Sequence, residues 1–420
     1  MTELEKLFAV KKTENGDVSY NTTGNHLLDL LFMTSYFEKH LGEVYIDTSE
    51  KSKLFARFVR DPRFGLGRRD LGRVLMYQAE ISPEEIVSSG RFDDLWCIGT
   101  TAMYDYLIKE CKKGNELAKK WMPRLNSKFR IIAMNICKKY NLTEKQYRKL
   151  IKCDSIENKL SRHKTNEIEF EHVPSLAMVK YYNRFSRGED TSVRFKEYLE
   201  SIKKGEKELK VSTTSVYDIY KNRKQIDADL FFDKLEKIEI NCIPILDTSG
   251  SMMDSVDSYG KACSIAHYLA KCSTYVNNQV ISFSYRPQLM TIRGKNYADE
   301  IRSLHTGDCS NTNFGAVMNI LKDLKEFPEY LIVLSDMEFD IGSHQSKLEL
   351  QKIWEENNCN TKIVWWNFNS RNKTVPEIDE FGNIYISGYS PMLLKYLETK
   401  FDGERFLDKL LEEYSKKIYK

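Results

Sequence analysis

The feature that most constrains the fold of this chain is a change of sequence pattern near residue 237. Before it, apolar residues recur at helical spacing and no strand-like alternation is visible. After it, residues 238–247 form a β-branched, apolar run, which is typical of a strand buried on both faces. Strand-like runs then alternate with helical ones, and this alternation predicts a mostly parallel, doubly wound sheet. We therefore expect an α-helical domain over residues 1–234 and an α/β domain over residues 235–420.

Each predicted domain contains a series of elements. In the first, the apolar spacing predicts helices at residues 24–40, 53–60, 71–79, 84–89, 99–111, 115–121, 127–140, 143–151, 174–187, 191–203 and 214–221. Short connections with Gly or Pro favour paired helices, which are compatible with an α-solenoid. In the second, we expect further strands at residues 279–284, 288–292, 329–335, 361–367 and 383–386, with helices at 258–275, 313–325, 344–357 and 391–418.

The length and composition indicate the broad class of protein. A chain of 420 residues is too long for one ordinary core, so two domains are expected. A charged fraction of 30% and a hydrophobic fraction of 41% are typical of a soluble globular protein, and no apolar run is long enough for a transmembrane helix. The N-terminal residues lack the apolar core of a signal peptide. The nine cysteines include no CxxC pair, so we expect reduced thiols in the cytoplasm.

A candidate metal site follows the first strand of the α/β domain. Asp247 ends that strand, and Ser249 and Ser251 complete the pattern DxSxS on a tight turn. The pattern alone is weak evidence, but Thr312 before a predicted helix and Asp336 at the end of a later strand supply two further oxygen ligands. An all-oxygen set suits Mg²⁺ or another hard divalent cation. This order and spacing resemble the metal-ion-dependent adhesion site of von Willebrand A domains.

The sequence leaves the role of this site open. An ion with few anionic ligands keeps a coordination position for an outside carboxylate or phosphate. Alternatively, the ion only holds the strand ends together, or the residues form a hydrogen-bond network without a metal.

Positive charge is concentrated in one segment of the helical domain. Residues 109–164 contain 17 Lys and Arg against 5 Asp and Glu, a balance of +12, although the net charge of the whole chain is only +3. A local basic field of this size indicates an anionic partner, and a solvated helical face is the alternative.

Several stretches of the chain resemble a known family. They are residues 60–69 (RDPRFGLGRR), 90–95 (GRFDDL), 120–124 (KWMPR), 145–150 (KQYRKL), 173–175 (VPS) and 335–340 (SDMEFD). Together they resemble the TROVE-like family, and most closely its branch of unknown function. The resemblance spans about residues 20–415. Members of this family, the Ro proteins among them, join a helical domain to a von Willebrand A domain.

The resemblance implies a ring of HEAT-like helix pairs closed by the A domain. It also implies binding of single-stranded RNA ends in the ring and of structured small non-coding RNA on a basic outer surface. The candidate RNA-binding residues here are Lys119, Lys120, Arg124, Lys128, Arg130, Lys138, Lys139, Arg148, Lys149 and Lys152. Four interleaved aromatic residues, Trp121, Phe129, Tyr140 and Tyr147, are candidates for stacking on unpaired bases, but Trp121 and Phe129 fit helical apolar stripes and favour core packing.

Other conspicuous residues have structural interpretations. The loop at residues 65–69 lacks the strand and the GK[ST] of a phosphate-binding loop, so we expect a helix-connecting turn whose arginines pair with Asp61, Asp70 or Asp93. Arg91 with Asp93 and Asp94 predicts an ion-pair and capping cluster. His267 lies in an apolar helix and is predicted to be packed.

Two functions remain compatible with these residues. No catalytic motif is present, so we expect a binding protein and not an enzyme, with a nuclease using the Asp247 and Asp336 ion as the catalytic alternative. The first function is Ro-like RNA binding in a ribonucleoprotein. The second is a protein-interaction scaffold whose A domain captures a partner carboxylate through Mg²⁺. No membrane partner is indicated, and a monomer is favoured.

Overall fold

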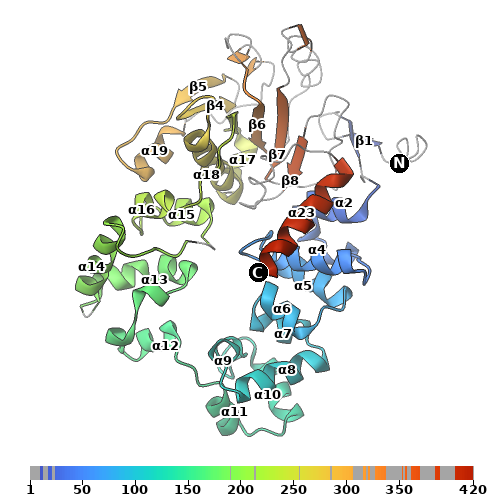
Figure 1. Ribbon diagram of the computed structural model, residues 1–420, viewed down its shortest axis with the longest axis vertical. Helices are drawn as coiled ribbons and strands as arrows, with labels where there is room; N and C mark the ends of the chain where they lie inside the picture. Colours follow the sequence, from blue (N-terminus) through green and yellow to red (C-terminus); the bar gives the residue numbers. More distant parts are fainter. Residues whose placement is uncertain are drawn as a thin grey trace. The chain divides into compact units, whose positions relative to one another are not determined.

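The computed structural model divides the chain into two compact units (Figure 1). It describes residues 10–12, 18–20, 24–305 (except 190, 212–213, 255 and 284–285), 316–317, 320–321, 327–336, 352, 355–356, 361–368, 384–387 and 403–419. The helical unit comprises residues 41–213 and 411–420, and the α/β unit comprises residues 1–40 and 214–410.

The helical unit is a succession of short helices. They are η1 (Leu41–Glu43), α4 (Glu50–Arg60), α5 (Arg69–Gln78), α6 (Pro83–Ser89), α7 (Phe92–Ile98), α8 (Thr101–Lys112), α9 (Glu116–Trp121), α10 (Arg130–Lys139), α11 (Glu144–Leu150), α12 (Ile156–Ser161), η2 (Thr165–Glu167), η3 (Phe170–His172), α13 (Ser175–Arg187) and α14 (Ser192–Lys203). Successive helices pack against one another, for example α4 on α5 and α13 on α14. The helix pairs expected from the apolar spacing are therefore confirmed.

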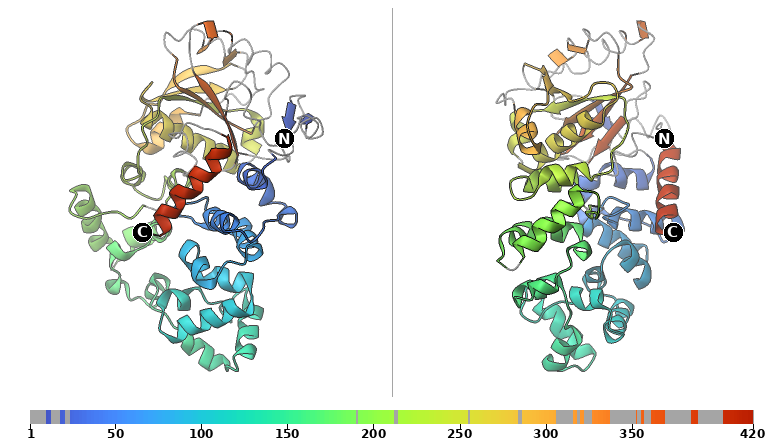
Figure 2. Two further views of the ribbon diagram at one scale, coloured as in Figure 1. Left: turned by 45° about the vertical axis from the view of Figure 1, so that its right-hand side comes forward. Right: turned by 60° about the vertical axis from the view of Figure 1, so that its left-hand side comes forward.

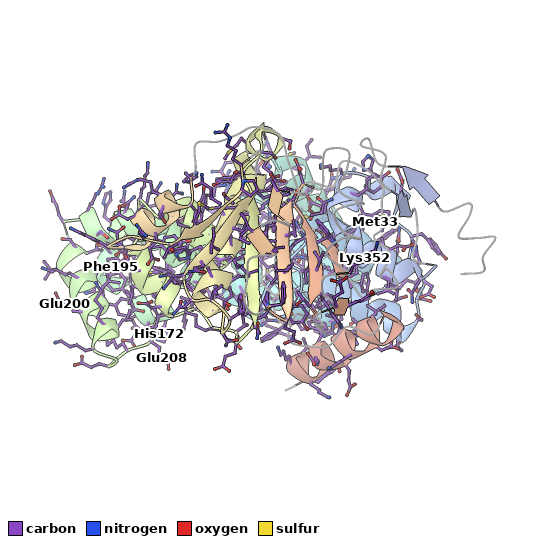
Figure 3. All side chains as sticks on the ribbon, turned by 90° about the horizontal axis from the view of Figure 1, so that it is seen from above. Met33, His172, Phe195, Glu200, Glu208 and Lys352 are labelled. Carbon is purple, nitrogen blue, oxygen red and sulfur yellow. The ribbon has the colours of Figure 1, made fainter. Side chains whose placement is uncertain are left out.

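Local sequence explains where these helices begin and what they bury. Thr143 and Gln146 form the predicted capping box at the start of α11, and Ser82 with Glu85 forms another at α6. In α13 and α14, aromatic residues at helical spacing meet in one core. Phe195 of α14, labelled in Figure 3, lies 5.4 Å from the ring of Phe185 and 5.0 Å from that of Phe170, measured between centroids.

The α/β unit is built on a six-stranded sheet with the order β5-β4-β3-β6-β7-β8 (Figures 1 and 2). The strands are β3 (Cys242–Asp247), β4 (Gln279–Phe283), β5 (Gln288–Thr291), β6 (Tyr330–Ser335), β7 (Lys362–Asn367) and β8 (Ile384–Ser387). All neighbours pair in parallel except β4 and β5. Its helices are α2 (His26–Phe32), α3 (Thr34–Phe37), α15 (Val216–Asn222), α16 (Ala228–Asp233), α17 (Gly250–Asp254), α18 (Val256–Cys272), α19 (Tyr297–Ser303) and the start of α23 (Gly403–Ile418).

The strand order determines where a ligand site can form. Counted from β3, the order is 3-2-1-4-5-6, which is that of a doubly wound nucleotide-binding sheet. Both central strands, β3 and β6, are buried along their whole length, as the apolar run at 238–247 predicts. In such sheets ligands bind outside the carboxyl ends of the strands, at the point where the order reverses. Here that point lies between β3 and β6.

Three expectations need correction. A two-stranded antiparallel pair, β1 (Val10–Lys12) with β2 (Val18–Tyr20), lies in the part expected to be all helical, and an Asn15-Gly16 hairpin signal separates its strands. Residues 24–40 form two helices, because the Thr34 hydroxyl donates to the carbonyls of Leu30 and Leu31 and competes with the helical bonds. Helices α7, α12, α16, α17 and α19 were not expected.

The remaining expectations are tested only in part. Helices at residues 313–325 and 344–357, and the first part of the one at 391–418, lie largely outside the described residues. The boundary at residues 234/235 stays a prediction. Helices α15 and α16 belong to the α/β unit, because α15 packs on α18 and α16 packs on α19. In the part of the chain that the structure describes, no helix is both long and apolar enough to span a bilayer.

Candidate functional site

The carboxyl end of β3 carries a buried carboxylate. Asp247 is the last residue of β3, and its side chain is fully buried. The Ser249 N–H donates to Oδ1 over 2.9 Å, and the Ser335 hydroxyl, at the end of β6, donates to Oδ2 over 2.5 Å. The pattern DxSxS drew attention to Asp247 and Ser249 but missed Ser335. The parallel register of β3 and β6 is what places Ser335 there.

The other predicted metal ligands gather at the same edge of the sheet. The hydroxyl oxygens of Ser249 and Ser251 are 3.2 Å apart on the turn that starts α17. Asp336 follows β6 directly, and its side chain is buried. The structure therefore brings together four of the five predicted ligands at the strand-order reversal. Thr312 lies outside the described residues.

Burial controls the charge of this edge. Burial raises the pKa of Asp247 to about 7, and the nearby carboxylate of Asp336 adds to the rise, while hydrogen bonds from Ser249 and Ser335 oppose it. A divalent cation beside two buried carboxylates stabilises their ionised form. Within the described residues, no three His, Cys, Asp or Glu side chains are grouped as a metal site. A cation here would therefore rely on serine hydroxyls, which suits a hard, partly hydrated ion such as Mg²⁺.

The basic segment forms a largely exposed surface of the helical unit. Seven of the ten predicted RNA-binding residues are exposed, and they are Lys128, Arg130, Lys138, Lys139, Arg148, Lys149 and Lys152. We call these seven residues the basic surface. Among the described residues, no ion pair involves Lys128, Arg130, Lys138, Lys149 or Lys152, whereas Arg148 pairs with Glu144 at 3.4 Å.

The other three predicted cations are more committed to the protein. The Arg124 guanidinium donates to the carbonyl oxygens of Ile151, Lys119 and Lys120 over 3.0–3.2 Å, and it joins α9 to the end of α11. Lys119 pairs with Glu116 at 2.8 Å, and Lys120 pairs with Glu157 at 3.2 Å. Of the three, Arg124 has the clearest structural role, because its hydrogen bonds reach backbone groups from two segments.

The interleaved aromatic residues differ in their environments. Tyr147 is fully buried and donates to the Pro123 carbonyl over 2.8 Å. Phe129 is 36% exposed and packs on Trp96, with ring centroids 4.8 Å apart. Trp121 carries the Arg91 guanidinium over its ring at 4.1 Å. Tyr140 lines a hollow in the surface. Tyr140 is therefore placed beside an open concavity.

The two family-like stretches at residues 60–69 and 90–95 build a buried ion-pair network. Asp94 is fully buried. It forms an ion pair with Arg60 at 2.7 Å and accepts a hydrogen bond from Arg73 over 2.6 Å, and Arg91 pairs with Asp93 at 2.8 Å. We call the residues Arg60, Arg73, Arg91, Asp93 and Asp94 the arginine cluster. The predicted ion-pair and capping role of Arg91, Asp93 and Asp94 is thus confirmed.

Glycines in the same two stretches allow close approaches. A Cβ on Gly65 would lie 1.8 Å from the Phe58 carbonyl oxygen, and one on Gly90 would lie 2.4 Å from Oδ2 of Asp94. The loop at residues 65–69 is the expected helix-connecting turn between α4 and α5. The ion pairs of Asp61, Asp70 and Asp93 are with other arginines than those of the loop, namely Arg63, Arg73 and Arg91.

His267 is packed, as expected. Its side chain is fully buried between the rings of Phe232 and Tyr297, with centroids 4.8 and 4.9 Å away. Its Nε2 lies 2.8 Å from a carboxylate oxygen of Glu300, which also binds Lys271 at 2.6 Å. Burial lowers the pKa of His267, so the neutral ring acts as a hydrogen-bond donor that links α18 to α19.

The fold and its two candidate sites define the class of this protein. One unit is helical and carries a basic surface. The other is a doubly wound α/β unit with a site rich in oxygen ligands at the ends of its strands. Comparison with known proteins relates this chain to two families of unknown function. The model of the domain of unknown function DUF2828 matches residues 113–241, and that of DUF7788 matches residues 241–417. The two matches meet at residue 241, directly before β3.

Two individual proteins are similar to the chain over nearly its whole length. Uncharacterized protein L728 of Acanthamoeba polyphaga mimivirus is 22% identical, over 96% of this chain and 87% of the viral protein. Among solved structures, the Ro (RSR) protein of Deinococcus radiodurans aligns with a TM-score of 0.44 and 10% identity, over 96% of each chain.

Proposed function

We propose that this chain is a cytoplasmic RNA-binding protein that holds single-stranded ends and structured small non-coding RNA on its basic surface. The observation that carries the proposal is the exposure of seven Lys and Arg side chains in a segment with a charge balance of +12. Cations that are not paired within the protein are available to phosphates, and each phosphate contact releases counterions from the nucleic acid. Binding, and not catalysis, is what such a surface supports.

Two helices supply most of the basic surface. Lys138 and Lys139 end α10, and Arg148 and Lys149 lie in the last turn of α11. The buried side of these helices, including Ala133, Ile136 and Tyr147, holds them in the unit. The cations can therefore be changed without altering the core.

The test is RNA affinity over a salt series. Lys138, Lys139, Arg148 and Lys149 are changed together to Glu. The control changes four exposed cations of the α/β unit to Glu, namely Lys224, Lys234, Arg293 and Lys295. Loss of four phosphate contacts should lower the slope of log affinity against log salt by roughly 3 for a single strand, since each contact contributes about 0.7. The control should keep the slope. Wild-type protein that purifies without nucleic acid and does not bind RNA at low salt contradicts the proposal.

A second candidate function concerns the carboxyl edge of β3 and β6. We propose that Asp247, Ser249, Ser251, Thr312 and Asp336 hold Mg²⁺ and that the ion captures a carboxylate of a protein partner. The observation that favours it is the convergence of two buried carboxylates and two hydroxyls at the strand-order reversal. Calorimetric titration with Mg²⁺ should give binding that Ser251→Ala weakens and Asp336→Asn abolishes. No heat of binding in the wild-type protein contradicts this proposal and leaves the RNA proposal intact.

A further inference from the structure

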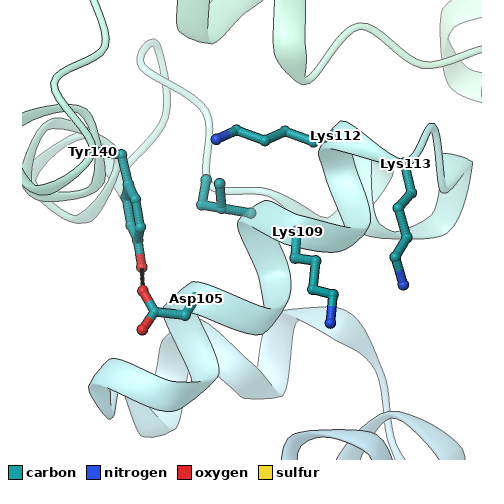
Figure 4. Close-up of a pocket in the computed structure, with 6 residues that line it drawn as sticks. Asp105, Lys109, Lys112, Lys113 and Tyr140 are labelled. Atoms are coloured by element: carbon teal, nitrogen blue, oxygen red, sulfur yellow. Dashed lines mark hydrogen bonds between the residues drawn. The ribbon is translucent and has the colours of Figure 1, made fainter.

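A hollow of about 460 Å³ opens on the helical unit beside the carboxyl-terminal half of α8 (Figure 4). It is lined by Asp105, Ile108, Lys109, Lys112, Lys113 and Tyr140. The three lysines are spaced i, i+3 and i+4, which places them on one side of α8 and its end. Tyr140 comes from the end of α10, where it is the C-cap residue. Two helices of the basic segment therefore share this hollow.

The charges around the hollow are not balanced. Lys109 and Lys112 are exposed, and no ion pair among the described residues involves either of them. Lys113 pairs with Glu110 at 2.7 Å. The Asp105 carboxylate, the one acidic group of the lining, accepts a hydrogen bond from the Tyr140 hydroxyl over 2.5 Å and lies 3.9 Å from Nζ of Lys139. The hollow thus offers two available ammonium groups, while its carboxylate is already engaged.

The hollow also has an apolar and aromatic side. Ile108 is 3% exposed and forms part of its floor. The hydrogen bond to Asp105 holds the Tyr140 ring in place, and Figure 4 shows this ring across the hollow from Lys112. A bare phosphate ion would use only the ammonium groups. A ligand that carries both a planar ring and a phosphate uses the whole lining.

We propose that this hollow binds one unpaired nucleotide of an RNA strand, with the base against Tyr140 and Ile108 and a phosphate between Lys109 and Lys112. The inference rests on the proposed RNA-binding function and adds a subsite outside the ten candidate residues. Aromatic stacking requires a base whose face is free, as in single strands, loops and ends. A base inside a duplex is covered on both faces by its neighbours.

The experiment measures binding of a short fluorescein-labelled oligouridylate to the full chain over a salt series, with an RNA duplex of the same length as a second probe. The variants are Lys109→Gln with Lys112→Gln, Tyr140→Leu and Tyr140→Phe. The matched charge control is Lys224→Gln with Lys295→Gln, two exposed lysines of the α/β unit. Circular dichroism checks that each variant is folded, and Tyr140→Leu keeps apolar volume so that the end of α10 stays packed.

The proposal expects a different signature from each variant. The double lysine variant should lower the salt slope by about 0.7, because one single-strand phosphate contact is lost. Tyr140→Leu should weaken oligouridylate binding roughly tenfold with the slope unchanged, since stacking carries no counterion release. Tyr140→Phe keeps a ring for stacking but loses the hydrogen bond to Asp105, so its affinity should fall between that of the wild type and that of Tyr140→Leu. Duplex affinity should be insensitive to Tyr140→Leu.

The failures of the two proposals can be told apart. If the wild type binds oligouridylate and all hollow variants match the charge control, the hollow is not a nucleotide subsite and the RNA-binding function stands. If the lysine variant is weakened but Tyr140→Leu is not, or if both probes lose affinity equally with Tyr140→Leu, the unpaired-nucleotide assignment is overturned. If the wild type binds neither probe, the RNA-binding function itself fails and the hollow assignment fails with it.

Discussion

The arginine cluster and the basic surface both consist of cationic side chains in the helical unit, yet their surroundings are opposite. In the arginine cluster Arg60 is 3% exposed and Asp94 is fully buried, with two arginines on one carboxylate. On the basic surface most cations have no acidic partner among the described residues. Charge content alone therefore does not indicate function. Burial and pairing decide whether a cation stabilises the fold or is available to an anionic ligand.

The largest expected effect comes from breaking the arginine cluster. Asp94→Asn leaves the buried Arg60 and the partly buried Arg73 without their shared carboxylate, and we expect a loss of about 3–5 kcal/mol in the free energy of unfolding. Urea denaturation measures it. Asp70→Asn is the matched control, because Asp70 pairs with the same Arg73 at 3.3 Å but is 69% exposed, so its loss should cost less than about 0.5 kcal/mol. Equal effects of the two substitutions would contradict the role given to burial.

Arg124 shares a feature with each of the two groups of cations. It lies in the basic segment, as the basic surface does, but its guanidinium is hydrogen-bonded within the protein, to backbone carbonyls. Its three carbonyl hydrogen bonds predict that Arg124→Gln costs about 2–3 kcal/mol in the free energy of unfolding. The folded variant should keep the salt slope of RNA binding. Lys128→Gln, at an exposed position, should lower the salt slope of RNA binding and leave the free energy of unfolding nearly unchanged. If Arg124→Gln lowers the slope and leaves stability unchanged, Arg124 belongs to the basic surface after all.

A partly buried ion pair in the α/β unit should have a smaller, pH-dependent effect. Burial opposes ionisation of Glu300, but His267 and Lys271 prevail and lower its pKa to about 2. Since the unfolded value is 4.5, the unfolded state binds more protons between these values, and stability falls as the pH drops from 4.5 to 2. Glu300→Gln should remove this part of the acid sensitivity. Water screens the pair, so the contribution is about 1 kcal/mol.

Urea midpoints of wild type and Glu300→Gln, measured at several pH values, check the prediction. The difference between the two proteins should be constant above about pH 6.5, where His267 is neutral in both, and should shrink as Glu300 is protonated between pH 4.5 and 2. Acid sensitivity from His267 starts below its ordinary value of 6.5, because burial opposes its protonation in the folded state. It should be larger in the variant, because Glu300 raises the pKa of His267. A difference that stays constant down to pH 2 would contradict the assignment to Glu300.

The sequence predicted features that depend on neighbouring residues, but not contacts between residues that lie far apart in the chain. Local patterns predicted a strand at 238–247, which the structure shows at Cys242–Asp247, and placed Asp247 at its end, since period and strand-end position are properties of neighbouring residues. Charge counting located the basic segment. The partners of Arg124 and Asp247 were not predictable, because Ile151 and Ser335 are 27 and 88 residues away and meet them only through packing and sheet register. Helix α16 escaped notice because Ala228, Leu230, Phe231 and Phe232 are all buried, which removes the amphipathic period.

The smallest expected effect lies on the basic surface itself. The pair between Glu144 and Arg148 is an exposed i,i+4 contact, with side chains 54% and 64% exposed. Glu144→Gln should therefore change the free energy of unfolding by only about 0.3–0.5 kcal/mol. It should also strengthen RNA binding by less than tenfold, because the carboxylate no longer competes with phosphate for Arg148 and no longer repels the strand. Glu412→Gln is the control, since Glu412 forms a similar exposed i,i+4 pair with Lys416 away from this surface. Stronger RNA binding with Glu144→Gln alone would show that a weak surface pair is one that a ligand can replace, in contrast to the buried pair of Arg60 and Asp94.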